Sequence, residues 1–156
     1  MRVEEIMTTK VFTVKENDLI DRVFFLINYE KIRHLPVVEK GKVIGIISDR
    51  DLYKSLGPKS NSNVIDGLAK TSELQVVETR VRNIMRRGVI TTTPDALLSV
   101  VAGIMAEHKI GALPVIDSNN KLVGIVSATD ILRVFSKLEH IRENCKKSIT
   151  EEASHS

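Results

Sequence analysis

The sequence predicts an α/β (α+β) fold in which two β-α-β-β-α repeats pack on one another as one unit. The first observation is that residues 45–51 return as residues 124–130, with the same order of glycine, apolar residues, serine and aspartate. The second is that a shift of about 78 residues aligns apolar positions along both halves. The third is size, because a half of about 55 residues is small for an independent core.

A short helix, a first strand and a longer helix are predicted at the start of each half. Residues 3–7 form the leading helix, and residues 11–14, which are rich in β-branched side chains, form the strand. Residues 18–29 carry apolar side chains on more than one helical face, which indicates a largely buried helix. In the second half, Thr93 is the expected N-cap of this helix and Pro94 its first residue. The matching segments of the second half are 81–85, 89–92 and 96–108.

A hairpin and a closing helix complete each half. In the first half, residues 35–38 and 43–47 are predicted to be two short strands joined by a turn. The closing helix is predicted from residue 48 to about 56, and its counterpart from residue 127 to about 145. Residues 148–156 are polar and show no apolar face, so we expect them to fray.

These elements divide the chain into repeat 1 (1–56), a linker (57–79), repeat 2 (80–140) and a helix end with a polar tail (141–156). Hydrophobic residues make up 42% of the chain, which is enough for a core. Cys145 is the single cysteine, so an internal disulfide is impossible and a redox cluster is not expected. No apolar run approaches the length of a membrane span, and the N-terminus does not resemble a signal peptide. We therefore expect a soluble cytoplasmic protein.

Two classes of function are disfavoured by the sequence. An enzyme is not expected, because there is no nucleophile with an adjacent histidine and acid, no metal-ligand cluster and no GxxxxGKS phosphate loop. Nucleic-acid binding is also not expected, because 23 basic residues face 20 acidic ones and aromatic residues reach only 4%, with no tryptophan. It stays an alternative because basic residues cluster at Arg80, Arg82, Arg86 and Arg87.

The repeated Ser-x-x-Asp motif is the strongest candidate for a site. An apolar strand ends at Ser48, which can cap a helix whose third residue is Asp51, and Ser127 and Asp130 repeat the arrangement. Backbone N–H groups and the helix dipole favour a phosphate there. The alternative is a capping box, in which the aspartate only turns back to its own serine. The motif occurs twice, and the residues that flank the two copies also match, which favours the ligand site. The glycine that opens each motif fits either a close approach to a ligand or a β-bulge.

Over residues 1–140 the chain resembles a tandem pair of cystathionine-β-synthase (CBS) domains. The resemblance rests on Ile-Met at 6–7 and 84–85, on Leu-Pro-Val at 35–37 and 113–115, and on the two Gly-Ile-hydrophobic-Ser-x-x-Asp motifs. It implies repeats that pack through their sheets as one pseudo-twofold module. It also implies two clefts for adenosine-containing ligands such as AMP, ADP, ATP or S-adenosylmethionine. Proteins of this family are usually regulatory.

The resemblance also assigns residues to parts of the ligand. Asp51 and Asp130 are expected to accept hydrogen bonds from the ribose hydroxyls, and Ser48 and Ser127 to contact phosphate. The base is expected at the ends of the first strands and at the residues before Leu-Pro-Val. These positions are Thr13, Val14, Lys15, Ile32 and Arg33, and in the second repeat Thr91, Thr92, Thr93, Ile110 and Gly111.

The two clefts are expected to differ in charge. The first has possible cations at three positions where the second has none: Arg33, His34 and Arg50 stand where Gly111, Ala112 and Thr129 stand in the other copy. We therefore expect the first cleft to prefer the more highly phosphorylated nucleotide. The alternatives are a solvated Arg33, a strand-end His34, and an Arg50 that only pairs with neighbouring acids.

The leading hypothesis is a stand-alone regulatory module that senses AMP, ADP or ATP, without a catalytic cofactor. Its output would pass to a regulated protein partner, whose identity stays open, or through oligomerisation. A homodimer built on residues 18–29 and 96–108 is expected, because CBS pairs commonly form a flat disc of four repeats. The alternatives are a module that senses S-adenosylmethionine and one that binds nucleic acid.

Overall fold

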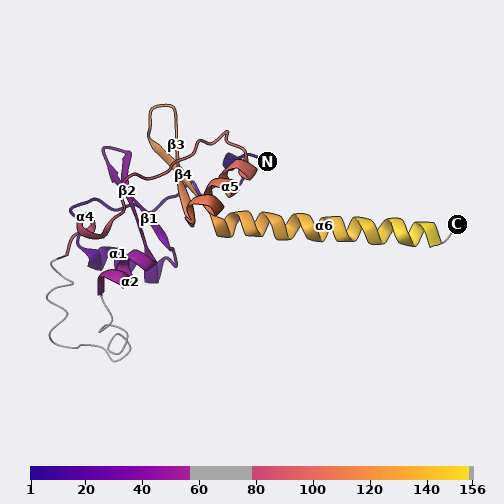
Figure 1. Ribbon diagram of the computed structural model, residues 1–156, viewed down its shortest axis with the longest axis horizontal. Helices are drawn as coiled ribbons and strands as arrows, with labels where there is room; N and C mark the ends of the chain where they lie inside the picture. The colour runs from indigo at the N-terminus through magenta and orange to yellow at the C-terminus, as the bar shows by residue number, and fades with distance from the viewer. Residues whose placement is uncertain (57–78, 155–156) are drawn as a thin grey trace, which may run out of the picture.

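The computed structural model describes residues 1–56 and 79–154 and shows two similar halves, each with one antiparallel hairpin and flanking helices (Figure 1). The first half contains η1 (Val3–Glu5), α1 (Ile20–Tyr29), β1 (His34–Glu39), β2 (Lys42–Ser48) and α2 (Asp49–Leu56). The second contains α4 (Val81–Ile84), α5 (Leu98–His108), β3 (Ala112–Ile116), β4 (Leu122–Ser127) and α6 (Ala128–Ser154). The expected linker lies outside the described residues, apart from Thr79.

Both hairpins match the sequence prediction and carry the same irregularity. In the first, Val37 pairs with Gly45 but Val38 pairs with Val43, so β2 has one extra residue there. In the second, Val115 pairs with Gly124 and the register shifts in the same way at the next residue. An extra residue of this kind bends the strand and increases its twist. The β-bulge that the glycines suggested is therefore present in both repeats.

The expected first strands are reduced to single parallel bridges. Val14 pairs with Val37, and Thr92 with Val115, and no named strand forms at residues 11–14 or 89–92. The Val14 N–H donates to Pro36 O at 3.1 Å, and its carbonyl accepts from Val38 N at 3.0 Å. Each segment therefore touches its hairpin at one residue, which is too little for a third strand.

The two leading segments, defined as residues 1–8 and 79–86, are exchanged between the halves. Val3 is fully buried in the core of the second half, while Val81 and Met85 lie in the core of the first. In Figure 1 the N-terminus lies beside α5, and α4 lies beside β2 and α1. The expected repeats 1–56 and 80–140 are therefore sequence units, and each core takes one segment from beyond its own unit.

Gly45 and Gly124 are explained by this exchange. A Cβ built on Gly45 would lie 2.8 Å from Met85 Sδ and 3.1 Å from the Arg86 carbonyl oxygen. On Gly124 it would lie 2.7 Å from Met7 Sδ and 3.1 Å from the Thr8 carbonyl oxygen. Glycine at these positions lets a leading segment lie directly against the hairpin. The close approach that the sequence assigned to a ligand is made by the chain itself.

Two helix boundaries differ from the prediction. Helix α5 begins at Leu98 with Leu97 as its N-cap, so Thr93 is not a helix cap. The Thr93 hydroxyl instead donates to Asp95 Oδ1 at 2.6 Å and closes a turn before the helix. Helix α6 continues to Ser154, through the segment expected to fray. No glycine or proline interrupts residues 128–154, so helix propensity alone does not stop it.

Helix α6 leaves the body of the protein as one long rod (Figure 1). Its first turns pack on the second core through Ile131 and Val134, whereas Leu138, Ile141 and Ile149 are exposed. Among the helices of the described residues, none combines the length and apolar character that crossing a membrane requires.

Candidate functional site

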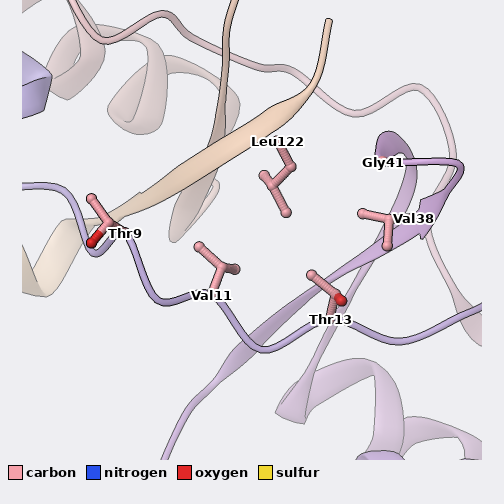
Figure 2. A pocket seen from close by; sticks show the side chains of 6 residues that line it. All are labelled: Thr9, Val11, Thr13, Val38, Gly41 and Leu122. Atoms are coloured by element: carbon pink, nitrogen blue, oxygen red, sulfur yellow. The ribbon is translucent and has the colours of Figure 1, made fainter.

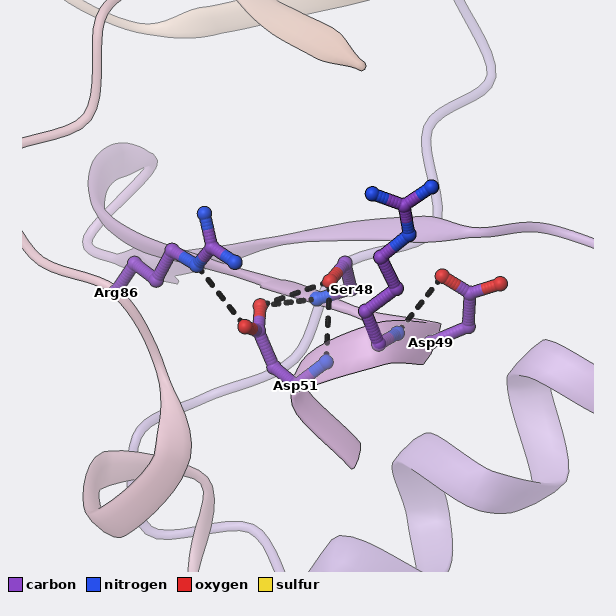
Figure 3. Close-up of polar contacts among 5 residues, drawn as sticks. Ser48, Asp49, Asp51 and Arg86 are labelled. Atoms are coloured by element: carbon purple, nitrogen blue, oxygen red, sulfur yellow. Dashed lines mark hydrogen bonds and ion pairs between the residues drawn. The ribbon is translucent and has the colours of Figure 1, made fainter. Parts of the chain in front are cut away.

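Ser48 and Asp51 form a closed set of hydrogen bonds at the start of α2 (Figure 3). Asp51 Oδ2 accepts from Ser48 N at 3.0 Å and from Ser48 Oγ at 2.9 Å. The Ser48 hydroxyl in turn accepts from Asp51 N at 3.2 Å. The capping box that the sequence offered as an alternative is therefore present. It fixes the orientation of the carboxylate, which uses Oδ2 for the cap and leaves Oδ1 for another partner.

The second motif repeats this geometry. Asp130 Oδ2 accepts from Ser127 N at 2.9 Å and from Ser127 Oγ at 2.6 Å, and Asp130 N donates to Ser127 Oγ at 3.3 Å. The two motifs differ in the partner of the outer carboxylate oxygen, Oδ1. Asp130 Oδ1 has a 3.5 Å contact with Arg133, which lies one turn along the same helix and has a side chain 71% exposed. The Asp130 side chain is 19% exposed.

Asp51 Oδ1 is instead held by Arg86, a residue that the sequence analysis did not place in the site. Arg86 Nε donates to Oδ1 at 2.9 Å, and the Asp51 side chain is only 9% exposed (Figure 3). Arg86 comes from the second leading segment, which packs on the first half. In the 78-residue alignment of the two halves, Arg86 corresponds to Thr8. This difference between the repeats was the signal in the sequence that could have pointed to Arg86. It was missed because the exchange of the leading segments is not visible in the sequence.

His34 and Gly111 meet where the two halves touch, and Arg33 precedes His34 in the chain. His34 pairs with Ser48, and Asp49 N donates to Arg33 O at 3.0 Å, which places both residues beside the first motif. Gly111 holds the matching place, since Ala128 N donates to Gly111 O at 2.9 Å. A Cβ on Gly111 would lie 3.0 Å from both Cε1 and Nε2 of His34. The two motifs are thus joined through the residues that precede Leu-Pro-Val.

The electrostatics around His34 differ from the expectation. Burial lowers the pKa of His34 from its ordinary value of 6.5, although Asp49 and Asp51 act in the opposite direction. The imidazole is therefore neutral at neutral pH and adds no cation beside the first motif. Arg33 Nε lies 4.0 Å from Asp49 Oδ2 and its side chain is exposed. Arg50 is also exposed, so both guanidinium groups lie at the surface near the first motif.

The residues expected around the base do not all lie at the motifs, since Val14 and Thr92 bridge to the middle of β1 and β3, at Val37 and Val115. Val14 and Thr92 are buried, and each has its N–H and carbonyl bonded to its own hairpin. Their side chains therefore support the core. Ile32 and Ile110 pack against the first and second cores, respectively. Thr91 is half-buried and Thr93 is exposed.

Thr13 lines a hollow of about 250 Å³ between the two halves (Figure 2). Its walls come from the extended N-terminal segment, the β1–β2 hairpin and β4: Thr9, Val11, Thr13, Val38, Gly41 and Leu122. A second hollow of about 340 Å³ beside the β1–β2 turn includes Lys15. Thr13 and Lys15 are thus placed at hollows, and neither hollow is lined by a serine or aspartate of the two motifs.

The arginine cluster at residues 80–87, which covers the second leading segment and the residue after it, contacts the first half. Arg80 Nη1 donates to Asn17 O at 2.6 Å, and Arg82 Nη1 donates to Asn17 Oδ1 at 2.8 Å. Arg87 lies 3.5 Å from Glu16 Oε2, and Arg86 binds Asp51. The four guanidinium groups therefore attach this segment to its neighbours. They do not form an unpaired basic stripe of the kind that binds a nucleic-acid backbone.

Comparison with known proteins gives one family and one fold. The family model described as CBS domain matches residues 3–57 and again residues 81–137. Among solved structures, the CBS domain pair of protein MJ0100 superposes with a TM-score of 0.73 at 29% identity, over 88% of this chain and 97% of that one. That structure is a complex with 5′-methylthioadenosine and S-adenosyl-L-methionine. The cytosolic domain of the Mg²⁺ channel MgtE, in complex with ATP, has a TM-score of 0.64 at 27% identity over 85% and 48% of the chains.

The curated relatives include short and long proteins. The CBS domain-containing protein YhcV of Bacillus subtilis (strain 168) is 32% identical over 83% of this chain and 81% of its own length. A homoserine O-acetyltransferase of Methanococcoides burtonii is 35% identical over 85% of this chain but only 24% of its own length. The chain spans 24–43% of the length of the first three curated relatives that it matches. The transferase name therefore refers to a protein of which this chain resembles one part.

Proposed function

The chain belongs to the CBS domain family and carries two copies of the domain in tandem; from this we propose that it binds an adenosine-containing ligand beside each Ser-x-x-Asp motif. The ribose diol lies on the outer oxygen of Asp51 or Asp130, and phosphate lies toward the serine and the helix N-terminus. Adenosine ligands in the MJ0100 and MgtE structures support this class of ligand.

One observation carries the proposal: both aspartates are oriented by their serines through Oδ2, and the cap does not use Oδ1. The inner oxygen of each is held by two hydrogen bonds from one serine. A carboxylate has about four acceptor positions, so the cap does not exhaust it. A side chain that is already fixed loses little conformational freedom when it binds a ligand. The cap therefore prepares each carboxylate for a diol.

The nature of the ligand beyond adenosine is a choice between two groups. AMP, ADP and ATP carry phosphate, which the N-terminal N–H groups of α2 and α6 favour. S-adenosylmethionine and methylthioadenosine lack phosphate and are the ligands of the MJ0100 structure. We favour the nucleotides, because Arg33, Arg50 and Arg86 surround the first motif and favour an anion.

The role that follows is regulatory. Ligand binding beside His34 and Gly111, where the halves touch, is positioned to change how the two halves fit together. The changed surface is then read by a protein partner or by a second copy of the chain. No catalytic step is assigned to the motifs, since the serine and aspartate of each motif bind one another within the helix cap.

A homodimer fits the exposed apolar side chains of the helices. Phe25 and Tyr29 on α1 are exposed and stack with ring centroids 4.3 Å apart. Val100 on α5 and Leu132 and Phe135 on α6 are exposed as well. Aromatic side chains of this kind are enriched at interfaces between proteins. We propose that a second copy covers this surface.

Calorimetric titration tests the proposed function. The purified chain is titrated with AMP, ADP, ATP, S-adenosylmethionine and methylthioadenosine, and with a short single-stranded oligonucleotide at physiological salt. We expect at least one adenosine ligand to bind and the nucleotides to bind more tightly than the other two. Binding of the oligonucleotide alone would overturn the proposal and favour the nucleic-acid alternative.

A further inference from the structure

An ion pair between Arg86 and Asp51 joins the first motif to the second leading segment, whereas Asp130 has a 3.5 Å contact with Arg133 of its own helix. Arg86 Nε lies 2.9 Å from Asp51 Oδ1, and the arginine side chain is 51% exposed. Given the proposed function, in which Asp51 binds a ribose, we infer that Arg86 selects the ligand of this cleft. It favours adenosine ligands that carry a phosphate and disfavours uncharged adenosine.

The selection begins with competition for the carboxylate. Asp51 Oδ2 accepts two hydrogen bonds from Ser48, and Oδ1 accepts one from Arg86. Of about four acceptor positions, one is left. A ribose diol donates two hydrogen bonds, so it displaces the guanidinium from Oδ1. The displaced bond is charge-assisted and belongs to the stronger class of hydrogen bonds.

A phosphate compensates for this displacement. Asp51 is the third residue of α2, so the helix N-terminus that favours an anion lies within the same turn. The half-exposed guanidinium has five N–H donors in a planar fork that matches phosphate oxygens. A nucleotide therefore gives Arg86 a new anionic partner where it leaves the old one. Uncharged adenosine gives it none.

The second cleft serves as an internal comparison. Arg86 and Ile46 exchange backbone hydrogen bonds of 2.9 and 3.0 Å, and Thr8 and Ile125 exchange two of 2.9 Å. Thr8 therefore holds the same backbone position beside Asp130 that Arg86 holds beside Asp51. Its side chain carries no charge, so the cation nearest to Asp130 Oδ1 is Arg133 of the same helix, whose contact is longer, at 3.5 Å, and whose side chain is 71% exposed. The Asp130 cleft is expected to bind adenosine and AMP with a smaller difference in affinity.

The test reads one cleft at a time with AMP and adenosine as probes. The Asp130→Ala variant retains only the Asp51 cleft, and Arg86→Thr is added to it to copy the residue of the other cleft. We expect the ratio of AMP affinity to adenosine affinity to fall about tenfold or more, with adenosine binding more tightly than before. Arg87→Thr is the matched control, since Arg87 is the next arginine and pairs with Glu16. It is expected to leave the ratio unchanged.

The reciprocal variant keeps the inference testable if Arg86→Thr lowers stability. Thr8→Arg in the Asp51→Ala chain is expected to raise the ratio of AMP to adenosine affinity. Equal ratios before and after both substitutions, or equal losses for both probes, would show that Arg86 only attaches the leading segment and would overturn the inference. That result differs from failure of the proposed function, in which neither probe binds the unsubstituted chain.

Discussion

Ser48 and Asp51 hold each other through three hydrogen bonds, and Ser127 and Asp130 repeat them. At the scale of residues, a helix cap and a ligand site are therefore not exclusive. The cap uses Oδ2 and the ligand is proposed to use Oδ1. What separates the two motifs is the group next to Oδ1, which is Arg86 in one and Arg133 in the other.

The pKa of His34 predicts a pH dependence of stability. Because burial lowers this pKa in the folded chain from 6.5, the unfolded chain binds a proton first as the pH falls. The free energy of unfolding should therefore be greatest above pH 6.5 and should decrease as the pH falls toward the folded pKa. The charged groups that act on His34 are Asp49, Asp51, Arg33 and Arg50.

Denaturant unfolding between pH 5 and 8 measures this effect. His34→Gln should make the free energy of unfolding less dependent on pH just below pH 6.5, because glutamine does not titrate. His108→Gln, which changes an exposed histidine on α5, should keep the slope of the unsubstituted chain. Identical slopes for all three proteins would contradict the assignment.

At the scale of elements, the exchanged leading segments and the β-bulges belong together. Each bulge lies next to the residue pair that contains Gly45 or Gly124. Each of these glycines faces a methionine of a leading segment. Met85 is buried and Met7 packs on the second core. The hairpin, its bulge and the leading segment thus form one packed unit in each half.

Gly45→Ala should destabilise the protein through this contact. The added Cβ would lie 2.8 Å from Met85 Sδ and 3.1 Å from a backbone oxygen, and overpacking typically costs about 1–3 kcal/mol. The free energy of unfolding should fall by that amount. Gly103→Ala is the control, because Gly103 lies in α5 with no heavy atom within 4 Å of a built Cβ. It should be neutral or stabilising by about 0.5–1 kcal/mol. A Gly45→Ala chain as stable as its parent would contradict the close packing.

The hairpins, the closing helices and both motifs could be predicted from the sequence, because each has a local signal. The strands are short apolar runs, β2 and β4 end at the serines of the motifs, and the duplication repeats both patterns. The predicted start of α5 was wrong, because Thr93 and Pro94 resemble the start of a helix. In the structure the Thr93 side chain bonds to Asp95 instead. The exchange of the leading segments has no local signal, since Val3 and Val81 occupy equivalent positions. Arg86 was missed for the same reason.

At the scale of the whole molecule, most large exposed apolar side chains of the described residues lie on helices, and the candidate ligand sites lie where the halves touch. The helices α1, α5 and α6 carry exposed Phe25, Val100 and Phe135. A dimer that covers these helices leaves the Ser-x-x-Asp motifs to the ligand. Ligand state could then be transmitted from the contact of His34 and Gly111 to the dimer.

Solution scattering tests the dimer. We expect a particle of twice the 17.4 kDa mass of the chain at micromolar concentration. Phe25→Glu places a charge on the exposed α1 surface and should shift the mass toward the single chain. Ser118→Glu adds the same charge at the exposed β3–β4 turn and should leave the dimer intact. A single-chain mass for the unsubstituted protein, with and without AMP, would contradict the dimer.

The central claim is that Asp51 and Asp130 bind the ribose of an adenosine ligand, and an AMP titration of the double variant Asp51→Ala, Asp130→Ala tests it most directly. Loss of the two caps should lower stability by about 0.5–2 kcal/mol each, so folding is checked by thermal unfolding. We predict that AMP affinity falls more than tenfold, because each ligand loses hydrogen bonds to a charged group. Asp21→Ala, which removes a carboxylate from the first turn of α1, should keep the parent affinity. A folded double variant that binds AMP as tightly as the parent would contradict the claim and leave the motifs as helix caps.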